Sequence, residues 1–136
     1  MNREILFRGK QKDNGEWVCG TPIFYSRGTT VMCKENQRNE NIDPKTVGQY
    51  TGLMDKNGKK IFEGDILNID CYAYDEPETS YFGCIECDEF GYGLLTPDGR
   101  GGYTWYYMCD VRGSYITEYE ICGNIHDNPE LLEEPS

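Results

Sequence analysis

Residues 61–74 read Ile-Phe-Glu-Gly-Asp-Ile-Leu-Asn-Ile-Asp-Cys-Tyr-Ala-Tyr, the longest stretch with the pattern of a strand. Its second half alternates, with Asn68 and Asp70 on one face of an extended chain. The opposite face carries Leu67, Ile69, Cys71 and Ala73. Alternation with a period of two is typical of a β-strand that buries one face. The stretch therefore predicts one long strand, Ile61–Tyr74, in a sheet with an apolar inner face.

The composition of the whole chain supports a sheet protein. Among its 136 residues there is one alanine, Ala73, against 16 glycines, ten isoleucines, eleven tyrosines and five phenylalanines. Alanine is the best helix former, whereas β-branched and aromatic side chains fit a pleated, half-buried surface. We therefore expect an all-β (mainly β) fold, a small barrel or sandwich of short strands.

Turn residues divide the rest of the chain into short segments. Asp13-Asn14-Gly15 and Lys56-Asn57-Gly58-Lys59 predict tight hairpin turns, and another hairpin is centred on Arg27-Gly28. Pro22 restricts its strand to a sheet edge or a break, because proline donates no backbone hydrogen bond. The remaining predicted strands are Arg3–Arg8, Glu16–Cys19, Ile23–Tyr25, Thr29–Lys34, Tyr81–Glu86, Tyr92–Thr96, Tyr103–Met108 and Tyr115–Cys122.

One β domain is expected over residues 1–126. Residues 35–44 are polar and predict a surface loop, which is the best internal boundary. It would separate N-terminal hairpins and the polar loop in residues 1–44 from a second part, residues 45–126.

Residues 127–136 form an acidic tail with the signals of one short helical turn. Asn128 is suited to the N-cap position and Pro129 to the first helical position. We expect Leu131 and Leu132 to dock on the domain itself, with a groove on a partner as the alternative.

Charge is divided unevenly along the chain. Residues 1–68 carry 11 basic and 9 acidic residues, a net charge of +2, whereas residues 69–136 carry 2 and 15, a net charge of −13. The second half cannot supply the clustered cations that a phosphate-binding surface needs. Its carboxylates either keep a small protein soluble or face a basic partner. Nine of the eleven tyrosines fall in the same half, and tyrosine is enriched at protein interfaces. The first half could instead contact nucleic acid through Arg3, Arg8, Lys10 and Lys12.

Seven cysteines and the absence of an export signal predict free thiols in a reducing compartment. No apolar run approaches the roughly 18 residues that a membrane span needs. Cys84 and Cys87 form the only C-x-x-C pair, a candidate for zinc or redox chemistry. A strand through both would point them to opposite faces, whereas a turn at Glu86 would let Cys71, Cys109, Cys122 or His126 complete a site. Buried thiols acting as small apolar side chains are the simpler interpretation.

The sequence gives little support for a catalytic site. His126 is the only histidine, and Cys122 is the nearest thiol in sequence, but nothing else marks a Cys–His site. Carboxylates at 70, 75, 76 and 78 and at 86, 88 and 89 fall in or beside predicted loops, where solvated acids are usual. The glycines between 91 and 102 lack the lysine of a phosphate-binding loop. We expect no enzymatic activity and no cofactor.

Three stretches resemble the YopX family of phage and prophage proteins. They are Arg3–Lys10 with the turn Asp13–Val18 behind it, Val47–Leu53 running on through Asp55–Ile66, and Ile121–Leu132. The resemblance implies a bacterial cytoplasm, a phage or prophage origin and an SH3-type β-roll over residues 45–126. It supplies no catalytic residues.

The predicted function is that of a non-catalytic accessory protein. Its partner would be a host or phage protein bound through an acidic, tyrosine-rich surface, with mimicry of nucleic acid as a sub-class. Self-association also stays open, because small rolls leave strand edges exposed. The candidate binding residues are Gln49, Tyr50, Thr51, Tyr72, Tyr74, Asp75, Glu76 and Glu78.

Overall fold

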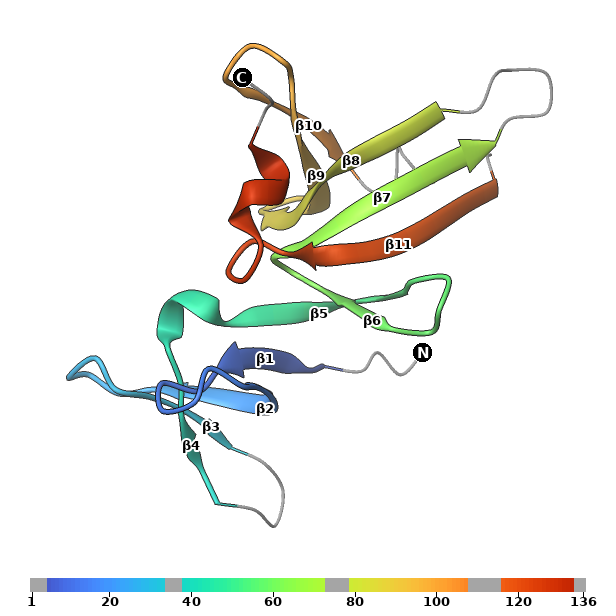
Figure 1. The fold of residues 1–136 in the computed structure, drawn as a ribbon. Coiled ribbons are helices and arrows are strands. Elements are labelled where there is room, and N and C mark those ends of the chain that lie inside the picture. Colours follow the sequence, from blue (N-terminus) through green and yellow to red (C-terminus); the bar gives the residue numbers. More distant parts are fainter. Residues whose placement is uncertain (1–4, 34–37, 73–78, 108–115, 134–136) are drawn as a thin grey trace. The chain divides into compact units, whose positions relative to one another are not determined.

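The computed structural model describes residues 5–33, 38–72, 79–107 and 116–133, and it confirms the all-β prediction (Figure 1). Two antiparallel sheets contain the described strands, with two single turns of 3-10 helix. The chain divides into two compact units, residues 1–52 (unit 1) and 53–136 (unit 2). The sequence prediction had placed an internal boundary earlier, after residue 44. The SH3-type roll stays a prediction.

Unit 1 contains most of the first sheet, whose strand order is β4-β3-β2-β1-β5-β6. The last strand of this sheet, β6 (Lys60–Phe62), belongs to unit 2. The elements of unit 1 are β1 (Phe7–Lys10), β2 (Trp17–Phe24), β3 (Thr30–Cys33), β4 (Glu40–Asn41), η1 (Pro44–Thr46) and the start of β5 (Gly48–Met54). The two predicted hairpins are confirmed, since β1 pairs with β2 and β2 with β3.

Pro22 lies inside β2 without interrupting it. Residues 17–20 of β2 pair with β1, whereas Thr21–Phe24 pair with β3. Among the described strands, the half of β2 that contains Pro22 pairs with β3 alone, which agrees with the predicted edge position.

The core of unit 1 corrects two sequence predictions. Met32 and Ile42 are fully buried together with Val18, so residues 40–44 are not a surface loop. Ile42 is the one large apolar residue among the polar residues 35–44. Because β4 pairs with β3, Ile42 reaches the core that Val18 and Met32 form. The first strand begins at Phe7 instead of Arg3, and Ile5, inside the predicted strand, is 73% exposed.

Unit 2 contains the end of β5 and the second sheet, whose strand order is β10-β9-β8-β7-β11. Its elements are β6 (Lys60–Phe62), β7 (Asp65–Tyr72), β8 (Thr79–Asp88), β9 (Gly91–Pro97), β10 (Tyr103–Tyr107), β11 (Ile116–Asn124) and η2 (Pro129–Leu132).

The predicted strand Ile61–Tyr74 is two strands, β6 and β7, joined by a turn. Gly64 has a φ of 91°, a conformation that favours glycine, and it breaks the run. The buried Asp65 carboxylate accepts a hydrogen bond from the Phe62 N–H at 2.8 Å and closes this turn. Residues 73 and 74 lie outside the described part.

Both faces of the second sheet bury apolar side chains. Leu67, Ile69, Ile85 and Leu94 form the main core with Ile61, which confirms the inward face predicted for β7. On the other face, Leu132 of η2 packs on a smaller cluster with Ile66 and Cys84.

The tail docks on the domain as expected, although through one leucine. Leu132 is buried, whereas Leu131 is 39% exposed. Asn128 is at the N-cap position and Pro129 begins the helical turn, as predicted, but the Asn128 side chain makes no capping hydrogen bond. Its oxygen instead accepts the Asn124 N–H at 3.2 Å. No helix among the described residues is long and apolar enough to cross a membrane.

Candidate partner-binding surfaces

Carboxylates gather on the outward face of β7 and β11. The register places Glu118 directly opposite Asp70, so two like charges face each other across the strands. The Ser80 hydroxyl donates to Asp70 at 2.7 Å, and Lys56 Nζ lies 3.2 Å from Glu120. The pKa of Lys56 is raised by its hydrogen bond and attraction to Glu120, and further by Glu118 and Asp70. Asp70, Glu118 and Glu120 form the acidic face.

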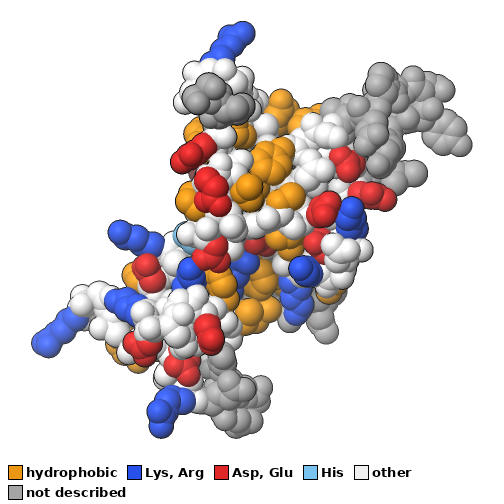
Figure 2. Space-filling model, in the orientation of Figure 1, with side chains coloured by type: hydrophobic (Ala, Val, Ile, Leu, Met, Phe, Trp, Pro, Cys, Tyr) orange, Lys and Arg blue, Asp and Glu red, His pale blue; other side chains and the backbone are white. Residues whose placement is uncertain are grey.

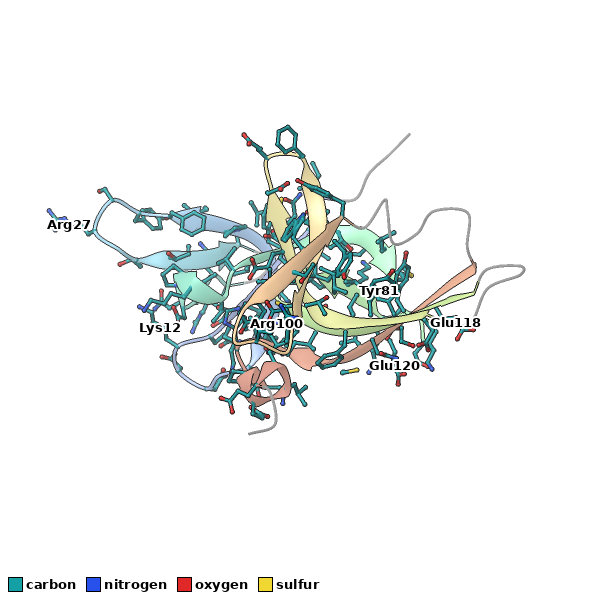
Figure 3. All side chains as sticks on the ribbon, turned by 90° about the horizontal axis from the view of Figure 1, so that it is seen from above. Lys12, Arg27, Tyr81, Arg100, Glu118 and Glu120 are labelled. Carbon is teal, nitrogen blue, oxygen red and sulfur yellow. The ribbon has the colours of Figure 1, made fainter. Side chains whose placement is uncertain are left out.

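Four tyrosines of unit 2 lie on the opposite side of the sheet. Tyr81, Tyr92, Tyr106 and Tyr119 pack against the main core, and the rings of Tyr81 and Tyr106 meet edge to face with centroids 4.9 Å apart. Figure 3 shows Tyr81 and Glu120 on opposite sides of the strands. The acids and these tyrosines therefore do not share one docking surface.

An exposed phenylalanine marks the turn between β8 and β9. Phe90 is 78% exposed, the largest value among the exposed large apolar residues of the described chain. Asp88 holds this turn, because one carboxylate oxygen accepts the Phe90 N–H at 2.8 Å and the other accepts the Tyr107 hydroxyl at 2.7 Å. The Tyr107 bond lowers the pKa of Asp88, burial opposes it, and bonds from the Phe90 and Gly91 backbone add to the lowering. Asp88 is therefore a carboxylate at neutral pH.

Two more carboxylates precede Phe90 closely in the chain. Glu86 and Glu89 are exposed, and Glu86 pairs across the strands with Gly93. We call Glu86, Asp88, Glu89 and Phe90 the acidic tip.

Aromatic packing supports the acidic tip from the neighbouring strand. The ring of Tyr107 meets Trp105 edge to face, with centroids 5.6 Å apart. A Cβ atom on Gly93 would lie 2.3 Å from the Trp105 ring, so only glycine leaves room for that ring. Trp105, Tyr107 and Asp88 thus connect β10 to the turn and fix its position.

The structure tests only some of the binding residues predicted from the sequence. Tyr50 and Thr51 are only 7% and 5% exposed, so their side chains do not form the expected contact surface, and Gln49 is half-buried. Tyr72 ends β7, and its side chain lies outside the described part, as do Tyr74, Asp75, Glu76 and Glu78.

The C-x-x-C pair does not form a chelating turn. Strand β8 runs unbroken through both residues, with Cys84 fully buried and Cys87 exposed, so the two thiols point to opposite faces. Burial and the nearby carboxylates of Glu63 and Asp88 raise the pKa of Cys87, which disfavours the reactive thiolate. Among the described residues, no three His, Cys, Asp or Glu side chains are placed to hold a metal ion.

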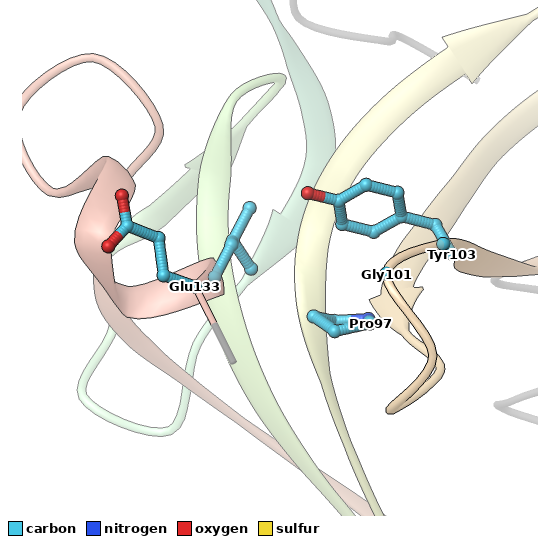
Figure 4. Close-up of a pocket in the computed structure, with 6 residues that line it drawn as sticks. Pro97, Gly101, Tyr103 and Glu133 are labelled. Atoms are coloured by element: carbon cyan, nitrogen blue, oxygen red, sulfur yellow. The ribbon is translucent and has the colours of Figure 1, made fainter. Parts of the chain in front are cut away.

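A hollow of about 220 Å³ lies between η2 and the turn that joins β9 to β10. Figure 4 shows the residues that line it. The hollow is lined by Pro97, Gly101, Gly102, Tyr103, Leu132 and Glu133. One phenol and one carboxylate at an open edge do not make a catalytic constellation.

Comparison with known proteins supports the resemblance seen in the sequence. The family model described as YopX protein matches residues 6–133. The chain belongs to the YopX family. A solved structure, "Crystal structure of protein EF1440 from Enterococcus faecalis", is similar with a TM-score of 0.52 and 25% identity, covering 97% of this chain and 100% of that one. No curated protein matches.

The stretches that carry the YopX resemblance hold the fold together. Asp55 closes the turn between β5 and β6 by accepting the backbone N–H groups of Asn57 and Lys59, each at 2.9 Å. Its other oxygen accepts the Ile121 N–H of β11 at 3.3 Å. The acidic tip lies between the second and third of these stretches. YopX is not a known enzyme family.

Proposed function

We propose that this YopX protein is a non-catalytic phage or prophage protein that binds a basic protein in the bacterial cytoplasm through its acidic tip. The observation that carries the proposal is the exposed Phe90 on a turn that Asp88 holds in place, with further exposed carboxylates at Glu86 and Glu89.

An exposed aromatic ring of this kind suits an apolar pocket on a partner. Complete burial of a phenylalanine side chain contributes about 1.5–3 kcal/mol. Binding residues whose positions are already fixed lose less conformational entropy on association, and Asp88 fixes the turn on both sides. Aromatic residues at the centre of an interface often dominate its binding energy.

The carboxylates specify the charge of the partner. Exposed Glu86 and Asp88 of β8 and exposed Glu89 of the turn all lie within four residues of Phe90, so the rim of the matching pocket should carry lysine or arginine. Such charges act mainly on association rate and on specificity. Phe90 has no counterpart in a phosphate backbone, which favours a protein-binding role over mimicry of nucleic acid.

The partner can be identified by placing a photo-crosslinking phenylalanine analogue at position 90 of the full chain in host lysate. The matched control is the same analogue at Phe24, which is 60% exposed on unit 1. Mass spectrometry should identify a basic protein that crosslinks from position 90 and not from position 24.

Calorimetry with that purified protein then tests the role of Phe90. Phe90→Ala should weaken binding about 10- to 150-fold, the equivalent of about 1.5–3 kcal/mol, and Phe24→Ala should leave it unchanged. Equal affinity of the Phe90→Ala variant and the unmodified protein would refute the proposal.

A further inference from the structure

Unit 1 presents one sheet face with a different charge from the acidic tip. The register places Arg8 beside Cys19, Lys10 beside Trp17, and Ile23 beside Val31, all opposite the face that buries Val18 and Met32. This basic face consists of Arg8, Lys10, Trp17, Cys19, Thr21, Ile23, Val31, Cys33 and Asn41. None of these strand residues is Asp or Glu.

A tryptophan organises the cations of the basic face. The Arg8 guanidinium carbon lies 4.6 Å from the centroid of the Trp17 ring, and the Lys10 ammonium lies 5.8 Å from it. Attraction between a cation and the ring quadrupole holds both charges beside the aromatic surface. The half-buried Trp17 of β2 therefore lies beside two cations of the adjacent strand β1.

A hollow of about 480 Å³ continues from these cations. It is lined by Lys10, Gln11, Lys12, Gly15, Asp43 and Thr46. The Thr46 hydroxyl accepts the Lys10 N–H at 2.8 Å and donates to the Asp43 carbonyl at 2.6 Å, which fixes one wall. Lys12, labelled in Figure 3, is exposed on the turn that follows β1 and adds a third cation.

The charges of the two units limit the strength of any anion site. Residues 1–52 carry 8 basic and 6 acidic residues, 8 − 6 = +2, and residues 53–136 carry 5 and 18, 5 − 18 = −13. On the face drawn in Figure 2, cations lie among carboxylates over β1–β4, whereas carboxylates and hydrophobic side chains predominate over unit 2. Acidic unit 2 repels a polyanion, so binding has to depend on short-range contacts at the basic face.

We propose that the basic face binds single-stranded nucleic acid, independently of the protein partner of unit 2. Arg8, Lys10 and Lys12 contact successive phosphates, and a base stacks against Trp17. An aromatic side chain with tracking cations is the usual arrangement for single strands, because every base offers a π-face. A paired duplex hides those faces, so it should bind more weakly.

Fluorescence anisotropy of the full chain with labelled 20-nucleotide oligo-dT, oligo-U and a 20-base-pair duplex tests the proposal. Three phosphate contacts predict a slope of about 2 in log Kd against log salt, at about 0.7 for each contact in a single strand. Lys10→Gln and Lys12→Gln should each raise Kd about fivefold, as expected for one exposed ion pair, and each should reduce that slope. Lys59→Gln, an exposed lysine in the β5–β6 turn, is the matched control and should change neither. The DNA and RNA arms show which single strand is preferred.

A second readout isolates the stacking contact. The chain has two tryptophans, so a Trp105→Phe background leaves Trp17 as the only one. Oligonucleotide should then quench the remaining fluorescence. The proposal is overturned if no single strand binds at 50 mM salt, if the duplex binds as tightly, if Lys59→Gln weakens binding equally, or if Trp17 is not quenched. Self-association that Lys10→Gln abolishes in light scattering would also overturn it, since the occupant would then be a second copy.

Discussion

Asp55→Ala should destabilise unit 2 more than the equivalent change in a matching turn. Asp55 is 6% exposed and joins two separate regions, because it closes the β5–β6 turn and also accepts the Ile121 N–H of β11. Loss of the two turn bonds costs about 0.5 kcal/mol each, because water reaches those amides. The Ile121 N–H is left without this acceptor in a half-buried position, which costs about 1–2 kcal/mol more. The total is about 2–3 kcal/mol.

The β9–β10 turn provides the control. Exposed Asp98 accepts the N–H groups of Arg100 at 2.7 Å and Gly102 at 3.1 Å, the same i+2 and i+4 pattern. Asp98→Ala removes only such turn bonds and should cost about 1 kcal/mol. With a urea dependence of about 2 kcal/mol/M, the unfolding midpoints should fall by about 1–1.5 M for Asp55→Ala and about 0.5 M for Asp98→Ala. Trp105 fluorescence in a Trp17→Phe background reports on unit 2 alone.

The effect of Asp55→Ala should also depend on pH. Burial raises the pKa of Asp55, but the backbone N–H groups of Lys59, Ile121 and Asn57 outweigh burial, so the pKa lies below its ordinary value. A lowered pKa means that the carboxylate stabilises the fold at neutral pH and that this contribution disappears as the pH falls through the folded-state pKa. The stability difference between wild type and Asp55→Ala should shrink over that range. Equal losses for Asp55→Ala and Asp98→Ala at pH 7 would show that the bond to Ile121 contributes nothing.

Three further outcomes are expected. Tyr107→Phe removes the hydroxyl bonded to Asp88, so the Asp88 pKa should rise toward its ordinary value in an NMR titration of the carboxyl carbon; an unchanged pKa would contradict the assigned cause. Ile42→Ala should cost about 2–5 kcal/mol in urea unfolding because the side chain is fully buried; a loss below about 1 kcal/mol would restore the surface loop. A thiol reagent should modify Cys87 in the folded protein and Cys84 only after unfolding; equal rates would contradict the unbroken β8.

The sequence predicted correctly the turns that depend only on residues close together in the chain. The turns at Asn14-Gly15, Arg27-Gly28 and Asn57-Gly58 are confirmed because each depends on residues within the turn itself. Ile42 was missed because its burial depends on pairing with distant strands, and nothing in its polar surroundings indicates a core. The break at Gly64 did leave a signal, since a glycine inside a strand pattern often marks a turn or a bulge.

The acidic tip depends on one contact that the sequence could not predict. The sequence predicts solvated carboxylates at 86, 88 and 89 in or beside a loop, and all three are exposed, with Glu86 and Asp88 in β8 and Glu89 in the turn. The sequence could suggest the Asp88 bond to Phe90, two residues away, but not the bond to Tyr107, which is 19 residues away on another strand. The sequence shows part of the separation of tyrosines from acids, because Tyr119 alternates with Glu118 and Glu120 in a predicted strand, and alternation places it on the opposite face.

The division of charge follows the folding units. The sequence was divided after residue 68 and the structure divides after residue 52, yet both give +2 and −13. The intervening residues explain this agreement, because Lys56, Lys59 and Lys60 balance Asp55, Glu63 and Asp65 within 53–68. Surface charge can change without altering a core, so each unit can acquire its own sign. A basic protein at the acidic tip and a single strand at the basic face therefore use different units, and binding of one should leave the residues that contact the other available.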